Sequence, residues 1–289
     1  MVAAGVQRLP FMNYWPDDYR SAVVFTHDVE TAEGVANIER VRKLEEKYKV
    51  VSSWNFVPER YPFDKGVFRT LRDQGCEIGV HGLYHDGKLF SSKKVFEERV
   101  PRINSYLRDW NAVGFRSPAT HRNPDWMPLI AAEYDSSFPD TDPFEPQAGG
   151  CCSIFPFFLG NLVELPITMP QDHTLFEILR HNDIAVWKQK AEWIIQNRGL
   201  VLVIIHPDYM LSAKNLGFYE RLLALLTEQS SLWQVLPMDV AAWWKNRTIS
   251  NLKNEDGRIS IEGPVSERGR VLWAELENLQ MSLKNNPSQ

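Results

Sequence analysis

The chain has 289 residues, of which 44% are hydrophobic and 24% are charged, and its formal net charge at pH 7 is −5. This composition is typical of a globular protein with enough apolar side chains for a large core, and it excludes a disordered chain. Nucleic-acid binders usually concentrate lysine and arginine on one face, so a weakly acidic chain is poorly suited to that role. We therefore expect no nucleic-acid partner.

The sequence contains no uninterrupted apolar run of membrane-spanning length, and residues 1–10 do not have the pattern of a signal peptide. Cys76, Cys151 and Cys152 form a sparse, odd set that is not a secreted disulfide framework. We therefore expect a cytoplasmic protein without a membrane span. An export signal outside the printed sequence is left open, as is a homo-oligomeric state.

Apolar, β-branched runs alternate with amphipathic stretches along the chain, which is the pattern of repeated βα units around a parallel sheet. In chain order we expect strands at residues 21–27, 50–57, 77–80, 112–115, 162–167, 200–205 and 234–236. The expected helices alternate with them at residues 35–49, 65–74, 91–110, 124–132, 184–197, 216–228 and 240–245. The stretch 135–160 is rich in Pro and Gly and reads as an irregular loop region.

Such a series is long enough to close, or nearly close, a barrel, and the active sites of these barrels lie at the C-terminal ends of the strands. We assign residues 1–247 to this barrel. Residues 248–289 differ, because Asn254-Glu255-Asp256-Gly257-Arg258 lies between alternating segments and predicts a hairpin. We expect residues 248–289 to form a small β-containing appendage that ends in a helix or tail.

Asp28 and Glu30 follow the first expected strand. Because side chains alternate in extended backbone, both carboxylates point to one face, while His27 and Val29 point to the other. Two carboxylates on one face can divide their roles, one binding a cation and the other acting as a base. The alternative is that Asp28 caps the next helix and Glu30 is solvated.

His81 and His85 follow another expected strand and are four residues apart, a spacing that suits two ligands of one metal ion. Gly82 and Gly87 favour a tight turn over a regular helix at this point. The pair could also arise by chance or satisfy local hydrogen bonds. In combination with the two acids, a metal site is the better interpretation.

Arg116 and His206 each end an apolar run. An arginine near a carboxylate keeps that acid ionised at neutral pH, although a surface ion pair would also explain Arg116. A histidine at the end of an aliphatic strand needs a partner or a task. A satisfied core histidine is the simpler reading of His206 alone, and a catalytic acid is the better one beside the other motifs.

These four motifs, in this order and at these separations, resemble those of the polysaccharide deacetylase family, which includes chitooligosaccharide and peptidoglycan N-deacetylases. The resemblance runs from about residue 21 to residue 244. It implies a distorted, often incomplete (β/α)7–8 barrel. It also implies a hydrolase that removes N-acetyl or O-acetyl groups from a carbohydrate with one divalent metal ion, most often zinc.

The resemblance assigns a role to each motif residue. It makes Glu30, His81 and His85 the metal ligands, Asp28 the base, Arg116 the residue that holds the base, and His206 the acid for the departing amine. Tyr84 and Pro118 are expected to contact the substrate. The usual first motif has adjacent aspartates, whereas Val29 intervenes here, so which carboxylate binds the metal stays open.

Two other functions remain open. A hydrolase of a small cyclic amide or imide C–N bond would use the same residues, since some cytoplasmic relatives of this fold act on such compounds. A catalytically inactive carbohydrate-binding protein would keep the barrel without the chemistry. Asp172 and His173, in the loop-rich middle, could reach the pocket or lie in a solvated loop.

Overall fold

The computed structural model describes residues 8–141, 147, 149–277 and 280–285. Part of the loop region expected at 135–160 therefore lies outside the described residues. The chain forms two compact units, one of residues 21–241 and one that joins residues 1–20 to residues 242–289. The boundary that we expect between residues 247 and 248 stays a prediction.

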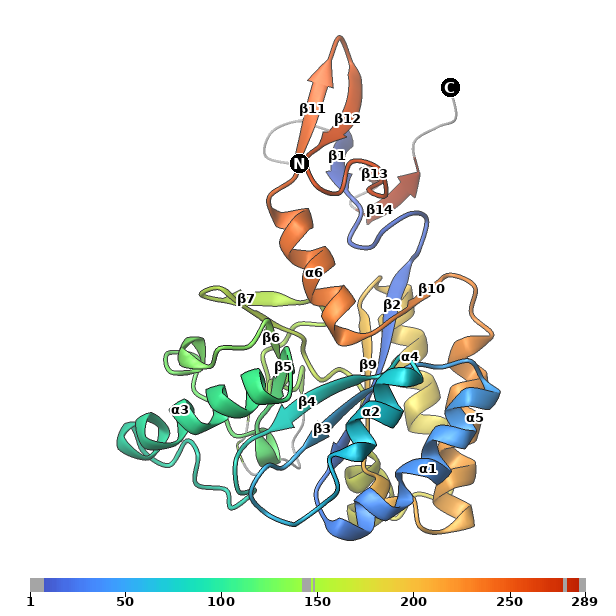
Figure 1. Ribbon diagram of the computed structural model, residues 1–289. Coiled ribbons are helices and arrows are strands. Elements are labelled where there is room, and N and C mark those ends of the chain that lie inside the picture. The colour runs from blue at the N-terminus through green and yellow to red at the C-terminus, as the bar shows by residue number, and fades with distance from the viewer. Residues whose placement is uncertain (1–7, 142–146, 148, 278–279, 286–289) are drawn as a thin grey trace. The chain divides into compact units, whose positions relative to one another are not determined.

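A curled, mostly parallel sheet forms the centre of the larger unit (Figure 1). Its strands are β2 (Ser21–Val29), β3 (Ser53–Phe56), β4 (Glu77–His81), β5 (Gly114–Arg116), β6 (Tyr134–Asp135), β7 (Phe157–Leu159), β8 (Leu162–Glu164), β9 (Leu200–Ile205) and β10 (Leu232–Gln234). The order is β9-β2-β3-β4-β5-β6-β8-β7. Strand β10 also pairs with β2, along its first residues, whereas β3 pairs with its last residues. Only β7 runs antiparallel to its neighbour among these described strands.

Beside β9, the segment that follows β8 forms hydrogen bonds as irregular backbone and not as a strand. Thr168 Oγ1 donates to the Leu200 carbonyl and accepts from Leu202 N–H, at 2.6 and 2.9 Å. Met169 N–H then donates to the Leu202 carbonyl at 3.3 Å. The predicted distorted, incomplete (β/α) barrel is therefore confirmed, with hydrogen-bonded loop in place of one strand.

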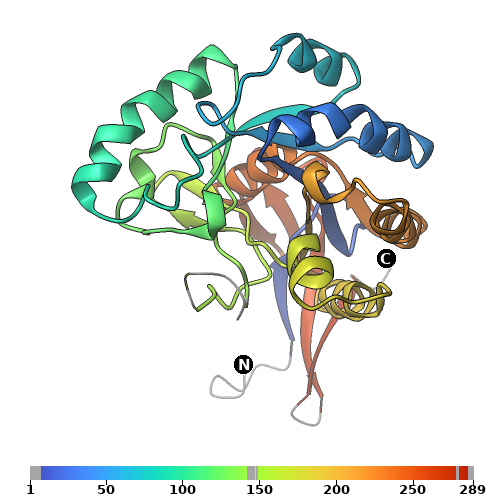
Figure 2. The same cartoon turned by 90° about the horizontal axis from the view of Figure 1, so that it is seen from below.

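Helices cover the outside of the sheet. They are α1 (Ala32–Lys47), α2 (Gly66–Asp73), α3 (Lys93–Asp109), α4 (Ala185–Gln196) and α5 (Ala213–Thr227), and Figure 2 shows them as an arc around the strands. The helix expected at residues 124–132 is wrong, because only the 3₁₀ turn Met127–Leu129 forms there. Pro128 lacks an N–H donor and restricts the residue before it, so a longer helix is disfavoured.

Strand β2 is buried on both faces, and its alternating side chains serve different layers. His27 points toward α1, where its Nε2 atom lies 2.7 Å from Glu45 Oε1. Asp28 points into the barrel, where its Oδ1 atom accepts from Arg116 at 3.0 Å. The alternation predicted from the sequence is therefore present at the end of this strand.

Glu45 is the centre of a buried polar network between β2 and the helices. Its fully buried carboxylate contacts His27 and accepts from Arg42, Ser52 and Tyr219, at distances of 2.6 to 2.8 Å. Burial raises the pKa of Glu45, but His27 and Arg42 lower it by more, so the net shift is downward. The carboxylate therefore stays ionised and fully hydrogen-bonded inside the fold.

The smaller unit contains β1 (Arg8–Met12), β11 (Asn251–Glu255), β12 (Arg258–Glu262), β13 (Val271–Glu277) and β14 (Gln280–Asn285), and α6 (Pro237–Thr248) leads into it. The hairpin β11-β12 agrees with the prediction, since Asp256 and Gly257 both have positive φ, as its two-residue turn requires. Of the helix or tail that we expected at the end, the helix is wrong for the described residues, because β13 and β14 form an antiparallel sheet with β1 there.

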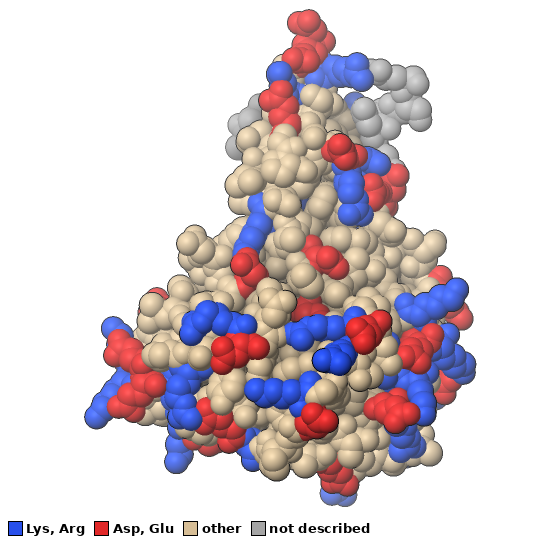
Figure 3. Space-filling model, viewed as in Figure 1, with Lys and Arg blue, Asp and Glu red and all other residues tan. Residues whose placement is uncertain are grey.

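Acidic and basic side chains are interspersed over the face that Figure 3 shows, which fits the small net charge. None of the described helices is long and apolar enough to cross a membrane. The absence of a nucleic-acid partner and the cytoplasmic location stay predictions.

Replacing Glu45 by Ala should lower the free energy of unfolding by about 3 to 5 kcal/mol, because Arg42 and its other partners lose their shared acceptor inside the fold. Urea unfolding followed by circular dichroism at pH 7 measures this change. Glu39→Ala, on the solvent side of the same helix, is the matched control and should leave the unfolding midpoint unchanged. Equal midpoints for Glu45→Ala and the control would contradict the central role of Glu45.

Candidate active site

The motif residues meet at the C-terminal end of the parallel strands. Asp28, His81 and Arg116 belong to β2, β4 and β5, and His206 follows β9. A cavity of about 210 Å³ opens there. Its lining comprises Asp28, Glu30, His81, His85, Arg116, Ser117, Ala119, Thr120, Gln171, His173, Thr174, Ile178, Ile204, His206 and Tyr209. The structure thus brings together residues that are up to 181 positions apart in the chain.

Arg116 is a buried cation that fixes the position of Asp28. Its Nη1 atom donates to Asp28 Oδ1 at 3.0 Å and to Thr26 Oγ1 at 2.9 Å. Its Nε and Nη2 atoms donate to the backbone carbonyl and the hydroxyl of Ser136, at 2.8 and 3.0 Å. The guanidinium is therefore held from two sides and directed at one carboxylate oxygen.

The same oxygen of Asp28 accepts a further hydrogen bond from Asn55 Nδ2 at 2.9 Å. Burial raises the pKa of Asp28, but Arg116, then His81, His206 and Asn55 lower it by more, and it falls to about 2. Asp28 is consequently ionised at neutral pH. Its other oxygen, Oδ2, lies 3.9 Å from His81 Nε2.

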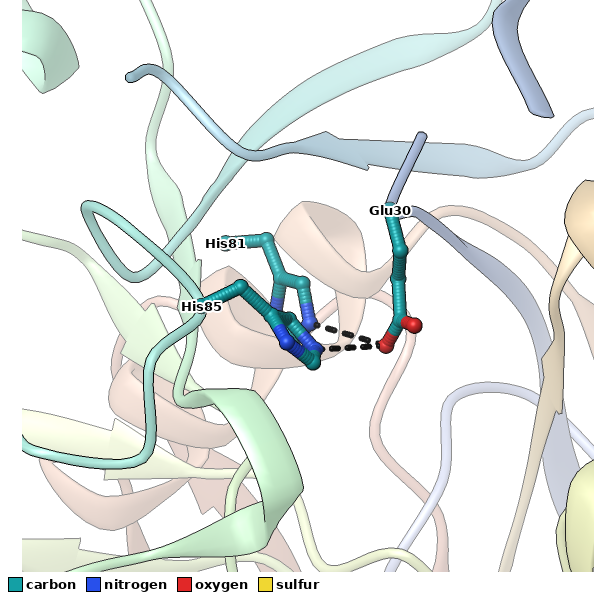
Figure 4. Close-up of side chains that lie close together, drawn as sticks. All are labelled: Glu30, His81 and His85. Carbon is teal, nitrogen blue, oxygen red and sulfur yellow. Dashed lines mark hydrogen bonds and ion pairs between the residues drawn. The ribbon is translucent and has the colours of Figure 1, made fainter. Parts of the chain in front are cut away.

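Glu30, His81 and His85 form a cluster of suitable metal ligands (Figure 4). Their candidate ligand atoms all lie within 4.8 Å of one another. Glu30 Oε1 is 2.7 Å from His85 Nε2 and 3.7 Å from His81 Nε2. Burial raises the pKa of Glu30, but the two neighbouring histidines, and then His206, lower it by more, well below its usual range.

The orientation of His81 fits a metal ligand. Its Nδ1 atom lies 3.1 Å from the Arg116 carbonyl, which can only accept, so Nδ1 carries the hydrogen. The buried Nε2 atom has no hydrogen-bond partner among the described residues and faces Asp28 and Glu30. A lone pair facing two carboxylates is unfavourable by itself, and a divalent cation between them removes the conflict.

A tight turn after β4 positions His85. Gly82 has φ of +62° and donates its N–H to the Arg116 carbonyl at 2.9 Å, and His85 itself has φ of +56°. A Cβ on Gly82 would also lie 2.6 Å from Pro118 Cγ. The turn predicted from the glycines is confirmed, and it turns the chain back so that both imidazoles face Glu30.

His206 is held by a carboxylate that sequence reasoning did not assign. Asp172 Oδ1 lies 2.6 Å from His206 Nδ1, and Asp172 Oδ2 accepts the His206 backbone N–H at 2.8 Å. Burial lowers the pKa of His206, but Asp172, then Glu30 and Asp28, raise it by more, to about 10. The imidazole is therefore protonated at neutral pH, and its Nε2 atom lies 3.8 Å from Glu30 Oε1.

Asp172 was noted in the sequence only as a residue that could reach the pocket. It is fully buried and 34 positions away from His206, and it approaches His206 because the segment after β8 runs along β9. No local pattern marks that approach. His173, which we expected could reach the pocket, does line the cavity. Tyr209, whose ring stacks on that of His173 with centroids 5.1 Å apart, is a cavity residue that we did not predict.

Pro118 and Tyr84, the expected substrate contacts, are not in the lining of this cavity. They line a much smaller neighbouring hollow of about 10 Å³. The Tyr84 hydroxyl accepts from Arg102, and the Arg99 and Arg102 guanidinium carbons lie 4.9 and 5.5 Å from its ring centroid. Substrate contact by either residue stays a prediction that the cavity does not support.

The fold has clear relatives among solved structures. A probable polysaccharide deacetylase from Pseudomonas aeruginosa PAO1 aligns with a TM-score of 0.62 and 15% identity, over 80% of this chain and 93% of that one. The PuuE allantoinase aligns with a TM-score of 0.61 and 14% identity, over 82% and 94%. No protein-family model and no curated protein matches the chain. The predicted resemblance to polysaccharide deacetylases is thus confirmed for the fold.

The purified protein should contain about one divalent ion per chain when it is prepared without chelators. His81→Ala should lose that ion and weaken zinc affinity at least about 100-fold, because it removes a ligand. Elemental analysis and zinc titration measure both effects. His121→Ala, which changes a histidine outside the cluster, is the control and should retain the ion. Zinc bound equally well by His81→Ala would contradict the assignment.

Asp172→Asn should lower the pKa of His206 by roughly one to three units, because the carboxylate is the main influence that raises it. NMR titration of the His206 ring in metal-free protein gives the value directly. Glu177→Gln, a carboxylate-to-amide change on the same segment but outside the cavity lining, is the matched control. An unchanged His206 titration in Asp172→Asn would show that Asp172 does not govern its charge.

Proposed function

We propose that the protein is a metal-dependent hydrolase of a non-peptide C–N bond that removes an acetyl group from an N-acetylated carbohydrate. An O-acetyl group would suit the same chemistry. The observation that carries the proposal is the Glu30, His81 and His85 cluster, flanked by an ionised Asp28 and a protonated His206 around one cavity. The shared fold of a probable polysaccharide deacetylase adds support.

Glu30, His81 and His85 would hold a divalent cation, for which the ligand set of two imidazoles and one carboxylate suits zinc. Bound there, the cation would supply Lewis acidity toward the substrate carbonyl and toward water. Glu30 is the better ligand candidate of the two acids because its Oε1 atom is closer to both histidines. Asp28 Oδ1 already accepts from Arg116 and Asn55.

Asp28 would act as the base. Arg116 and Asn55 hold its Oδ1 atom, so Oδ2 is left to accept the proton of the attacking water. A pKa of about 2 makes Asp28 a weak base, but it keeps the carboxylate ready over the whole neutral range. The surroundings of Asp28 therefore favour a defined position of the carboxylate over a high basicity.

His206 would act as the acid. Asp172 holds its Nδ1 side, so Nε2 is directed to the cavity and carries the proton to be donated. Water oxygen adds to the acetyl carbon, the C–N bond breaks, and the nitrogen leaves as an amine after taking the proton of His206. Acetate and a free amino group are the products.

Hydrolysis of a small cyclic amide or imide is the second candidate. The cavity of about 210 Å³ is smaller than the roughly 300 to 1,000 Å³ of typical ligand sites, so it suits one compact group. The fold shared with the PuuE allantoinase is in keeping with that candidate. An inactive carbohydrate-binding protein is the third, and the complete set of ionised and oriented groups argues against it.

The zinc-loaded protein should release acetate from N-acetylglucosamine oligomers, measured by an enzyme-coupled acetate assay. Asp28→Asn should reduce kcat/KM by about 100- to 10,000-fold, because the general base is lost. Glu39→Gln, an exposed carboxylate-to-amide change, is the control.

Ring opening of succinimide or allantoin without acetate release would favour the second candidate. Glycan binding by a zinc-loaded protein that turns over neither substrate class would favour the third. Absence of zinc binding would contradict the metal-dependent mechanism.

A further inference from the structure

The backbone of Glu30 lies just beyond the parallel sheet. The register of β2 with β9 ends at His27, and its register with β3 ends at Val29. Helix α1 begins only at Ala32, with Thr31 as its N-cap. The sheet ladder therefore does not fix the residue that carries the central carboxylate of the metal cluster.

The carboxylate of Asp208 lies at this position. Its Oδ2 atom accepts the Glu30 backbone N–H at 3.1 Å, and its Oδ1 atom accepts the Thr31 hydroxyl at 2.5 Å. Thr31 Oγ1 in turn accepts the Gly34 N–H at 3.1 Å. A carboxylate is also electrostatically favourable at a helix N-terminus, here that of α1.

Gly34 leaves the space that this arrangement needs. A Cβ at Gly34 would lie 2.6 Å from both Cγ and Oδ1 of Asp208, a separation that forces the carboxylate to move. The glycine lies in the first turn of helix α1, and glycine has a lower helix propensity than alanine. Space for the Asp208 carboxylate gives a physical reason for glycine at this position.

Asp208 also links the segment of His206 to the segment of Glu30. It lies in the turn Pro207–Tyr209, directly after His206. The same turn is held to α1 by Asn37, whose Nδ2 atom donates to the Pro207 carbonyl at 2.8 Å. One short segment thus carries both the acid candidate and the carboxylate that holds the Glu30 backbone.

We propose that Asp208 is a positioning residue of the metal site, which holds the Glu30 backbone where its carboxylate meets His81 and His85, and that Gly34 provides the space for it. This inference rests on the proposed metal-dependent function. It explains how an acid two positions after Asp28, and beyond the strand ladder, is held in a fixed place.

The test is zinc titration against a chromophoric chelator, with urea unfolding of each variant as the stability check. Asp208→Ala should weaken zinc affinity about 10- to 100-fold, as loss of an outer-shell partner does. Asp208→Asn keeps one acceptor oxygen and should retain an intermediate affinity. Gly34→Ala should also weaken binding, and it should add little to Asp208→Ala, because the group that it displaces is already absent.

A matched pair serves as the control. Asp64 Oδ1 accepts the Gly66 N–H at 2.8 Å at the start of α2, and a Cβ on Gly66 would lie 3.1 Å from Asp64 Oδ2. Asp64→Ala and Gly66→Ala should leave zinc affinity unchanged. In metal-free protein, the Glu30 amide should exchange its hydrogen faster in Asp208→Ala than in Asp64→Ala, because its acceptor is lost.

The outcomes separate the two proposals. Tight zinc binding by the wild type and by Asp208→Ala alike would overturn the role of Asp208 and leave the proposed function intact. No zinc binding by the wild type would overturn the metal site itself, and this inference with it. If Asp208→Ala does not fold, Asp208→Asn and Gly34→Ala decide the question, and wild-type affinity in both would overturn the inference.

Discussion

The buried ion pair between Arg116 and Asp28 is the interaction on which the site depends. Each group alone would lose roughly several kcal/mol of solvation on burial, so neither is tolerated there without the other. The guanidinium also takes its remaining partners from Thr26 and Ser136, so it ties β2, β5 and the segment after β6 to one point. The base candidate is thereby ionised and hydrogen-bonded by the fold itself, without a substrate or cation.

The two faces of strand β2 have different roles, one structural and one in the candidate site. On the helix side, His27 and Glu45 anchor the strand in a satisfied polar network. On the barrel side, Asp28 faces the cavity, and Glu30 follows two positions later on the same side. Because side chains alternate along a strand, a shift of one position would turn each of these side chains to the opposite face and destroy both networks.

Local sequence predicted a good part of this arrangement. The apolar runs marked most core strands, the glycines marked the turn that carries His85, and the positions of Asp28, His81, Arg116 and His206 at strand ends predicted their convergence. Where local signals were weak, prediction failed. A short 3₁₀ turn at Pro128 forms in place of the helix expected at 124–132. Where we expected a final helix or tail, two strands pair with each other and with β1.

The sequence by itself determined which residues are capable of the chemistry and which strands carry them, because periodicity and residue type are local properties. Only the tertiary structure decided the pairs that hold them: Asp172 on His206, Asp208 on the Glu30 backbone, and Glu45 on His27. These contacts join residues between 18 and 178 positions apart. A buried polar group takes whichever partner the packed strands and helices bring within hydrogen-bond distance, and the one-dimensional pattern does not contain that distance.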